Sequence, residues 1–402
     1  MNRNLLKLSG IAQKEKRNII GLMSGTSLDG LDIALCEISG FGADTTVELK
    51  KFVTKNYSRN VQFRLKKISS VSNVRLSELC YQHRWLAVIH AGLILDALRE
   101  WAVKPSDIDA IASHGQTVYH YPAQDQTEFS EPLHTTLQIG DSDTIAVETG
   151  IVTIGDFRQK HIAHGGEGAP MAEFVDALIF GDTTEPRILL NIGGIANYTY
   201  IPSGEGIKDT FTADVGPGNT LIDRLTESYF GESFDRDGNI AKSGKVHHKL
   251  LNALESDSWF KDETSISTGP EYFNIDWMKR LSAKSGVNFD DINPRDLIAT
   301  ATELSGKIIA EHILKKSKIG QDTVIYVSGG GAHNPALMET IRKYLGSLTI
   351  HNFSKLGINP DAKEALIFAV LANETLAGNG FTFTDKKGIE KKIQFGKISF
   401  PI

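Results

Sequence analysis

The stretch that decides the fold reads Asn18-Ile-Ile-Gly-Leu-Met-Ser-Gly-Thr-Ser-Leu-Asp-Gly-Leu-Asp-Ile-Ala-Leu35. Two short apolar runs, residues 19–23 and 31–35, flank a polar turn over residues 24–30. Apolar runs bounded by Gly, Ser and Asp are typical of a β-hairpin. The two glycines of the turn would let backbone N–H groups approach phosphate oxygens closely. Because Gly, Ser and Asp are also ordinary turn residues, this stretch alone fits a phosphate-binding loop and a plain polar turn equally well.

The length and composition bound the class of protein. A chain of 402 residues exceeds the ~250–300 residues at which a single core usually splits, so we expect two domains. The net charge of −6 gives no basic footprint for nucleic acid. The two cysteines, Cys36 and Cys80, are too few for a disulfide framework or a four-cysteine zinc site. No apolar run is long enough to span a membrane, and residues 1–17 are too polar for a secretory signal. We expect a poorly ordered leader and a cytoplasmic protein.

Further strands and helices follow the hairpin. The pattern predicts a strand over 43–56, a helix over 76–101 and a short buried strand over 108–112, which runs into Ser113-His-Gly-Gln-Thr117. His114, Gln116 and Thr117 would lie at the carboxyl end of that strand. Ligands collect at this edge in open α/β sheets. A lone histidine there can equally be a hydrogen-bonded structural residue.

A second candidate site follows the strand predicted over 152–155. Asp156 and Arg158 come directly after that strand and before the glycine-rich segment 161–170. Asp156 is a candidate general base. Arg158 would lie on the same face of an extended segment, where it could pair with Asp156 or hold an anionic substrate. His161 and His164 have no further ligands at metal-binding spacing, so we interpret them as polar loop residues.

The second half of the chain repeats the first. Residues 188–201 form another apolar run, glycine turn and apolar run. Residues 211–220 then lead into a helix over 221–229, whose N-terminus would carry Gly216, Gly218 and Asn219. Free N–H groups at such a position favour anions. Asp214 is a hard oxygen ligand of the kind that suits Mg²⁺.

A third glycine turn follows the strand predicted over 322–328. Gly329, Gly330 and Gly331 precede a helix over 336–345, with Asn334 as its N-cap and Pro335 in its first position. A flat glycine surface accepts a ring or a sugar that a side chain would exclude. No GxxxxGK[ST] loop occurs, and no GxGxxG follows a strand, so neither a P-loop nor a Rossmann dehydrogenase is supported. Glycine turns in both halves instead suit two similar α/β domains closing on a nucleotide.

With these motifs in place, the sequence resembles the bacterial anhydro-N-acetylmuramic acid kinases of the actin-like superfamily, from about residue 19 to 372. The matching motifs span residues 21–32, 113–117, 155–158, 165–170, 191–197, 214–219 and 328–334. The resemblance implies two actin-like (ribonuclease H-like) domains with mixed sheets flanked by helices around a central nucleotide cleft. We place the leader at 1–17, the N-terminal domain at 18–143 plus a tail from about 373 to 402, and the C-terminal domain at 144–372.

The resemblance also implies the reaction. Members of this family convert 1,6-anhydro-N-acetylmuramic acid, ATP and water to N-acetylmuramate 6-phosphate and ADP, in recycling of cell-wall murein. Both partners would be small molecules, the amino sugar and ATP with Mg²⁺, and no nucleic acid or membrane is expected. Whether the chain forms a homodimer is left open. Two alternatives also stay open: a kinase of another amino sugar, and a non-catalytic nucleotide-gated binding protein, against which the Gly-Asp-Phe-Arg motif argues.

Site residues carry over position by position. By resemblance, Asp156 is the base that activates water, and Asp214 is the candidate Mg²⁺ ligand. His114, Gln116, Thr117, Arg158 and Glu303 would contact the sugar. The segment after Arg158 departs from the family pattern at His161 and Glu167, which leaves the details of the substrate open. The residues expected to contact ATP are Ser24, Gly25, Thr26, Ser27, Asp29, Gly30, Asn191, Gly193, Gly194, Gly216, Gly218, Asn219, Gly329, Gly330, Gly331 and Asn334.

Overall fold

The computed structural model describes residues 2–169, 171–204, 209–261, 272–316, 319–320, 322–384 and 389–402. The chain divides into two compact units: unit 1 comprises Met1–Ile179 and Asp361–Ile402, and unit 2 comprises Phe180–Pro360. The predicted boundaries at 143/144 and 372/373 lie elsewhere. They differ because a strand over Thr153–Gly155 pairs inside the sheet of unit 1, and a helix over Lys363–Leu376 packs against the same sheet.

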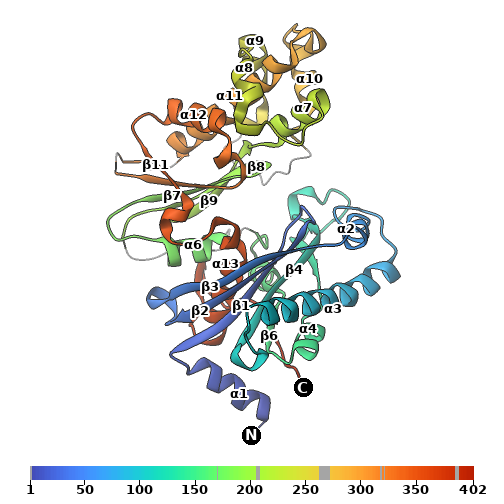
Figure 1. Cartoon of the computed structure of the whole chain (residues 1–402), viewed down its shortest axis with the longest axis vertical. Helices are drawn as coiled ribbons and strands as arrows, with labels where there is room; N and C mark the ends of the chain where they lie inside the picture. Colours follow the sequence, from blue (N-terminus) through green and yellow to red (C-terminus); the bar gives the residue numbers. More distant parts are fainter. Residues whose placement is uncertain are drawn as a thin grey trace. The chain divides into compact units, whose positions relative to one another are not determined.

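The helices and strands are labelled in Figure 1. Those of unit 1 are α1 (Arg3–Ala12), β1 (Lys16–Ser24), β2 (Gly30–Ser39), β3 (Thr46–Asn56), α2 (Arg59–Lys66), α3 (Leu76–Glu100), β4 (Ala110–Tyr121), β5 (Thr135–Ile139), α4 (Ser142–Thr149), β6 (Thr153–Gly155), α5 (Phe157–Ala163), α6 (Ala172–Phe180), α13 (Lys363–Leu376), β12 (Phe381–Thr384), β13 (Glu390–Ile393) and β14 (Lys397–Ser399). Those of unit 2 are β7 (Arg187–Ile192), β8 (Ile195–Ile201), β9 (Phe211–Pro217), α7 (Thr220–Phe230), α8 (Asn239–Ser243), α9 (His248–Glu255), α10 (Ile275–Lys284), α11 (Pro294–Lys316), β10 (Val324–Ser328), α12 (Pro335–Leu345) and β11 (Thr349–Asn352).

The sheet of unit 1 grows from the predicted hairpin, which is confirmed. β1 and β2 pair antiparallel, β2 pairs antiparallel with β3, and β1, β4 and β6 run parallel. β4 is longer than the predicted strand because its second half finds antiparallel partners in β5, for example Gln116 opposite Ile139. His114, Gln116 and Thr117 therefore lie inside a strand, and the prediction that they follow its end is wrong.

Unit 2 repeats the same topology, which confirms the internal repeat. Its strand order β9-β8-β7-β10-β11 matches β3-β2-β1-β4-β6 of unit 1. The directions match as well, with two antiparallel pairings followed by two parallel ones. This repeated unit with a mixed sheet and flanking helices is the expected actin-like fold.

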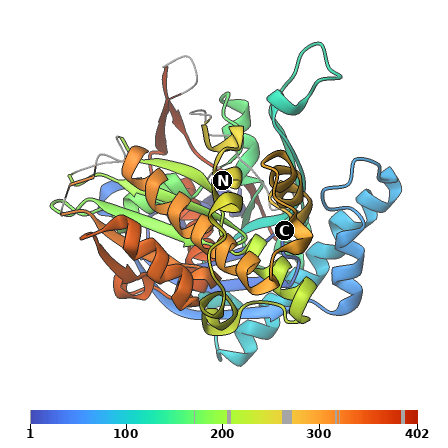
Figure 2. The ribbon, with the colours of Figure 1, turned by 90° about the horizontal axis from the view of Figure 1, so that it is seen from above.

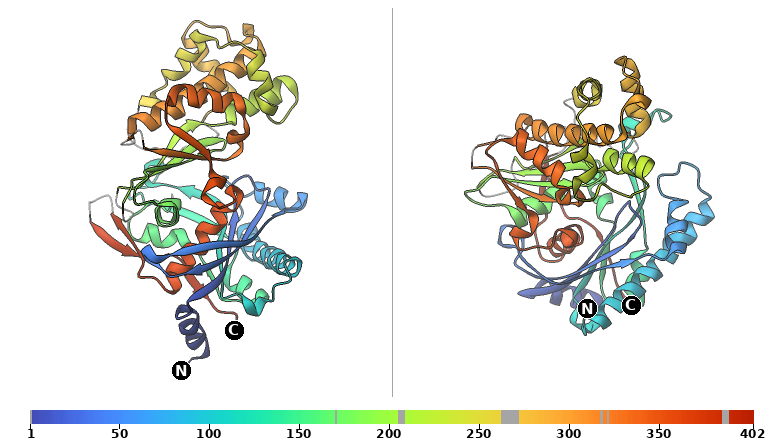
Figure 3. Two further views of the ribbon diagram at one scale, coloured as in Figure 1. Left: turned by 60° about the vertical axis from the view of Figure 1, so that its left-hand side comes forward. Right: turned by 45° about the horizontal axis from the view of Figure 1, so that its top comes forward.

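Helices cover both faces of the sheet in unit 1 (Figure 3). Successive strand residues point to opposite faces, and Ile20 and Leu22 belong to the buried cluster that contains Leu86 and Ile94 of α3. Gly21, between them, faces α13, and a Cβ atom at this position would collide with the backbone of that helix. The glycine is therefore required by the close approach of helix and strand.

A large core cluster of unit 2 lies on one side of its sheet. Alternate residues of β7, such as Ile188 and Leu190, form one buried cluster with residues of α7, α11 and α12, including Ile298 and Leu337. Figure 2 shows α11 lying across the strands of this sheet. None of the helices in the described ranges is long and apolar enough to span a membrane.

The predicted leader is part of unit 1, and the expectation of a poorly ordered segment is wrong for its described residues. The side chain of Asn2 caps α1 by accepting from the amide of Asn4, and β1 already begins at Lys16. Arg17 is 2 % exposed, and its Nε donates to Oδ1 of Asn373 on α13 at 2.6 Å. Pairing of this arginine with a distant helix could not be recognised from local sequence.

Candidate active site

The turn between β1 and β2 exposes a short polar segment. Leu28 adopts a positive φ of 58°, its amide donates to the Gly25 carbonyl at 3.3 Å, and its side chain is buried in the core. This conformation leaves Thr26, Ser27 and Asp29 exposed. The hydroxyl of Ser27 donates to Oδ1 of Asp29 at 2.8 Å. The tip of the turn thus presents hydroxyl groups and one carboxylate to solvent.

The two ends of the same turn are buried in the fold. The Ser24 hydroxyl donates to Oε1 of Gln116 at 2.6 Å, and Nε2 of Gln116 donates to the Gly25 carbonyl at 3.1 Å. A Cβ atom on Gly30 would lie 2.7 Å from the carbonyl oxygen of Lys55 on β3, so this glycine is required by strand packing. Ser24, Gln116 and Gly30, expected to contact ligands, thus have structural partners that fix the turn.

Tyr57 and His90 extend this buried hydrogen-bond network. The Tyr57 hydroxyl lies 2.7 Å from the Ser24 hydroxyl and 2.7 Å from Nε2 of His90. Burial lowers the pKa of His90 to about 3, so its ring is neutral at physiological pH. Thr117, in contrast, faces β5, where its hydroxyl accepts from Nε2 of Gln138 at 3.1 Å.

Asp156 occupies a strained position between β6 and α5. Its φ of 58° places it in the left-handed region, and its side chain makes no capping hydrogen bond. Non-glycine residues in this region cluster at functional sites. The carboxylate is accessible to solvent and forms an ion pair with Lys397 of β14. Lys397 reaches Asp156 because β14 pairs antiparallel with β6, with Lys397 opposite Gly155.

Arg158 does not pair with Asp156. The predicted extended segment is the helix α5, and residues two apart on a helix point to different sides. Nε of Arg158 donates to Nε2 of His114 at 2.8 Å, and its Nη1 donates to the Gly168 carbonyl at 2.8 Å. Of the two roles considered for Arg158, pairing with the aspartate is therefore wrong, and holding an anionic substrate stays a prediction.

Glu364 is a further candidate site residue. It lies in the first turn of α13, where acidic residues are common at helix starts, so nothing in the local sequence marks it. Desolvation by the surrounding protein raises its pKa, which Lys363 and Arg158 oppose. Desolvation also lowers the pKa of Arg158 to about 10, and Glu364 opposes that shift. Glu364 and Arg158 are therefore close enough for their charges to interact.

His161, where the sequence departs from the family pattern, has its side chain in the core. The ring is buried and stands edge-on to Phe174, with ring centroids 5.6 Å apart. Burial lowers its pKa to about 4. Our interpretation of His161 as a polar loop residue is wrong, because α5 turns this side chain into an aromatic cluster. His164 follows as the C-cap of the same helix.

In unit 2 the glycine turn between β7 and β8 covers the start of α7. The amides of Gly218 and Asn219 donate to the carbonyls of Gly194 and Gly193 at 2.9 and 2.8 Å, and the amide of Thr220 reaches Gly194 at 3.3 Å. These N–H groups are therefore occupied, and the expectation that they stay free for an anion is wrong. Gly194 itself is exposed.

Gly216 packs closely against aromatic side chains of the core of unit 2. Its φ is +137°, and a Cβ atom there would lie 3.1 Å from a ring carbon of Phe260 and 3.4 Å from one of Trp259. Both aromatic side chains pack against the core cluster of unit 2, which includes the fully buried Phe273. Trp259 and Phe260 are therefore part of the core packing of unit 2.

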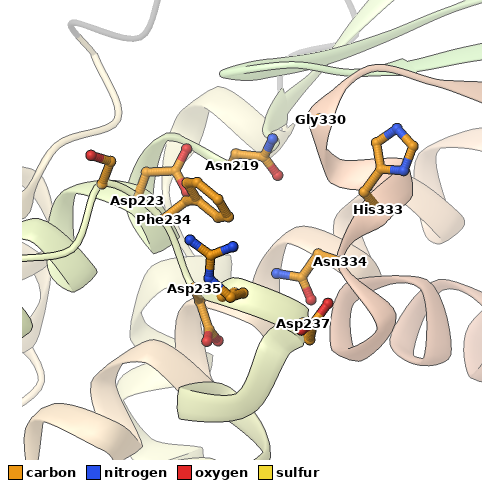
Figure 4. A pocket seen from close by; sticks show the side chains of 10 residues that line it. Asn219, Asp223, Phe234, Asp235, Asp237, Gly330, His333 and Asn334 are labelled. Carbon is orange, nitrogen blue, oxygen red and sulfur yellow. The ribbon is translucent and has the colours of Figure 1, made fainter.

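The third glycine turn opens onto a cavity of about 490 Å³. Figure 4 shows the side chains around it, which come from α7, the following loop and the turn before α12. Asn334 caps α12 by accepting from the amides of Ala336 and Leu337 at 3.1 and 3.2 Å, as predicted. Gly329 and Gly331 approach the end of β7 so closely that a Cβ atom would clash there. The lining residues are Asn219, Asp223, Ser233, Phe234, Asp235, Arg236, Asp237, Gly330, His333 and Asn334.

The chemistry of this cavity is aromatic and acidic. The guanidinium of Arg236 lies 5.4 Å from the ring centre of Phe234, a stacked pair open to solvent. Asp235 is buried and accepts from the amides of Ile240 and Ala241 at 2.8 and 2.9 Å. Burial, with Asp235 nearby, raises the pKa of Asp223 to about 6. A flat ring and hydroxyl groups fit such a lining better than phosphate groups do.

Two remaining predicted residues also lie in unit 2. Asp214 is on β9, opposite Asn197 of β8. Among the residues that the structure describes, no group of three or more His, Cys, Asp or Glu side chains could hold a metal. Glu303 lies on α11, where its Oε1 accepts from Nζ of Lys343 at 2.6 Å and from the hydroxyl of Tyr344 at 2.7 Å. Its oxygen therefore joins α11 to α12.

The repeated α/β unit fits the class of actin-like nucleotide-binding proteins, and the family match places the chain among the sugar kinases of that class. The family model for anhydro-N-acetylmuramic acid kinase matches residues 17–401. The chain belongs to this family and is a kinase. Its membership excludes the alternative of a non-catalytic binding protein and establishes that it uses ATP and a sugar.

Three relatives of the same name illustrate the similarity. The protein from Pseudoalteromonas atlantica is 45% identical and that from Pseudoalteromonas translucida 42%, each covering 100% of both chains. The protein from Caldanaerobacter subterraneus is 36% identical over 98% of this chain and 99% of its own. A ROK family glucokinase from Streptomyces griseus, solved with glucose and AMPPNP, covers 88% of this chain and 98% of its own at 10% identity and a TM-score of 0.36, a likeness too weak to carry an argument.

Proposed function

We propose that this kinase opens 1,6-anhydro-N-acetylmuramic acid with water and transfers the γ-phosphoryl group of ATP to O6. The products are N-acetylmuramate 6-phosphate and ADP, and the reaction serves cytoplasmic recycling of murein. The observation that carries the proposal is the position of Asp156. A carboxylate in a strained backbone conformation stands at the end of β6, two residues before the arginine of the same motif.

Asp156 is the base in this scheme. It accepts a proton from the water that attacks the anomeric carbon, the bond from that carbon to O6 breaks, and O6 attacks the γ-phosphorus as ADP leaves. A cation-like charge develops on the sugar during this step, so only modest base strength is required. Lys397 of β14 forms an ion pair with this carboxylate.

The nucleoside of ATP belongs in the cavity of unit 2. Its volume of about 490 Å³ lies within the range of small-molecule sites. Phe234 and Arg236 offer a surface for a base to stack on, and Asp223 and Asp237 offer acceptors for hydroxyl or amino groups. Exposed groups are candidates for phosphate contacts within each unit taken by itself: Thr26 and Ser27 in unit 1, and Gly194 in unit 2.

Mg²⁺ fits the donors that the chain offers. This ion usually keeps several waters and binds one or two carboxylates together with substrate phosphates, so the single carboxylate of Asp214 suffices. When bound, the ion would neutralise charge on the phosphates during transfer. Arg158 would hold the anionic part of the sugar, with Glu364 close by.

A labelling assay tests the reaction. The purified protein is incubated with the anhydro-sugar, ATP and Mg²⁺ in ¹⁸O-water, and the product is analysed by mass spectrometry. We expect one ¹⁸O on the anomeric carbon and one phosphoryl group on unlabelled O6. An Asp156→Asn variant should lose turnover by several orders of magnitude while still binding ATP. Phosphorylation of another amino sugar in preference to this one would favour the alternative kinase.

A further inference from the structure

The ring of His114 is held in one defined protonation state by its hydrogen bonds. The side chain is 3% exposed. Nδ1 lies 2.9 Å from the carbonyl oxygen of Gly115, and Nε2 lies 2.8 Å from Nε of Arg158. A carbonyl only accepts, so Nδ1 carries the hydrogen; a guanidinium only donates, so Nε2 is the free acceptor. His114 is therefore a neutral imidazole protonated on Nδ1, and burial together with the Arg158 charge lowers its pKa well below the ordinary value.

The same contacts fix the plane of the Arg158 guanidinium. Nε is held by His114 and Nη1 by the carbonyl of Gly168 at 2.8 Å. The imidazole in turn packs against Phe368 of α13, with ring centroids 4.7 Å apart. Within the part of the chain that the structure describes, Nη2 donates to no protein acceptor. The guanidinium is thus rigid on one edge and available on the other, which suits recognition of a planar anion such as a carboxylate.

We propose that His114 is a positioning residue that aims Arg158 at the carboxylate of the acidic sugar, without touching the sugar itself. This inference rests on the proposed function, because the carboxylate belongs to the proposed substrate. A neutral acceptor is the suitable partner for this task. A carboxylate at position 114 would also orient Arg158, but it would add a negative charge beside a guanidinium that already interacts with Glu364, and would weaken binding of an anion.

Steady-state kinetics with two sugars test the assignment. One is the anhydro-sugar acid, and the other is its neutral carboxamide. We expect His114→Ala to raise KM for the acid about tenfold, the effect of losing one charge-assisted hydrogen bond that orients the guanidinium. KM for the carboxamide and for ATP should change less than about twofold, because neither depends on the Arg158 charge. The control is His248→Ala, which removes an exposed histidine of α9 and should leave the preference for the acid unchanged.

A conservative variant separates positioning from folding. In His114→Gln the amide oxygen takes the place of Nε2, so this variant should restore KM for the acid towards the wild-type value. The double variant His114→Ala/Arg158→Met should be no worse on the acid than Arg158→Met alone. ¹⁵N NMR of the wild-type protein should show the hydrogen of His114 on Nδ1.

Three results would overturn the inference: equal losses on both sugars in His114→Ala and His114→Gln, additive losses in the double variant, or a hydrogen on Nε2. Failure of the wild-type protein to phosphorylate either sugar would be a separate outcome, distinct from the three above. That outcome overturns the proposed function, and this inference with it.

Discussion

Acidification should weaken unit 1 through His90. This ring is buried on α3, it shares a hydrogen bond with Tyr57, and burial lowers its pKa from 6.5 to about 3. In the unfolded chain the same histidine keeps its ordinary pKa and binds a proton first. The stability that the neutral ring contributes is therefore complete above pH 6.5 and is lost as the pH falls from 6.5 towards 3.

The size of this effect follows from the two pKa values. Stability changes by about 1.36 kcal/mol per pH unit for one proton taken up only by the unfolded state. At pH 4.5, two units below the unfolded pKa, His90 should cost about 2.7 kcal/mol of the free energy of unfolding. A His90→Gln variant keeps an acceptor near the Tyr57 hydroxyl but does not titrate. On acidification to pH 4.5 its free energy of unfolding should therefore fall by about 2.7 kcal/mol less than that of the wild type.

Hydrogen exchange of the α3 amides measures this difference in unit 1 alone. Protection is compared between pH 7.5 and 4.5 for the wild type and for His90→Gln, after correction for the intrinsic rates of exchange. The control is His83→Gln on the same helix, whose side chain is 47% exposed, and it should behave as the wild type does. Identical acid sensitivity in the wild type and His90→Gln would refute the claim that His90 is buried neutral.

Three further perturbations probe the packing and the two sites. Gly21→Ala should cost more than about 3 kcal/mol or prevent folding, because the added Cβ collides with the α13 backbone at Ala365; an unchanged melting temperature would contradict this packing. Lys397→Met should lower kcat/KM less than about fivefold, since its side chain is 69% exposed and exposed pairs contribute about 0–1 kcal/mol; a loss of a hundredfold would mean that the lysine acts directly in catalysis. Phe234→Ala should raise KM for ATP about tenfold through lost stacking of the base, and an unchanged KM would place the nucleoside outside this cavity.

Local sequence predicted the elements because its signals are local. The hairpin around residues 24–30 and its repeat at β7 and β8 follow from apolar runs and glycine turns. The start of α12 follows from the Asn334 cap. These features depend on neighbours a few residues away, whose periodicity and turn chemistry can be read directly.

Some of the glycines predicted to contact ATP pack closely against other parts of the chain. Gly30 faces the backbone of β3, and Gly216 faces the ring of Phe260. A glycine signals that something approaches the backbone closely, but the sequence does not say whether a ligand or another part of the chain does so. The helix α5 could not be predicted because its seven residues are too few to show a helical period before the glycine-rich segment that follows.

The sequence by itself determined the repeated α/β architecture, the family and the motif that carries Asp156. Only the tertiary structure decided which of the motif residues meet. Gln116 anchors Ser24 across 92 positions, and Lys397 reaches Asp156 across 241. Arg158 is oriented by His114 and not by the aspartate beside it in sequence. Such partners are set by strand pairing and helix direction over long separations, and a local pattern carries no information about either.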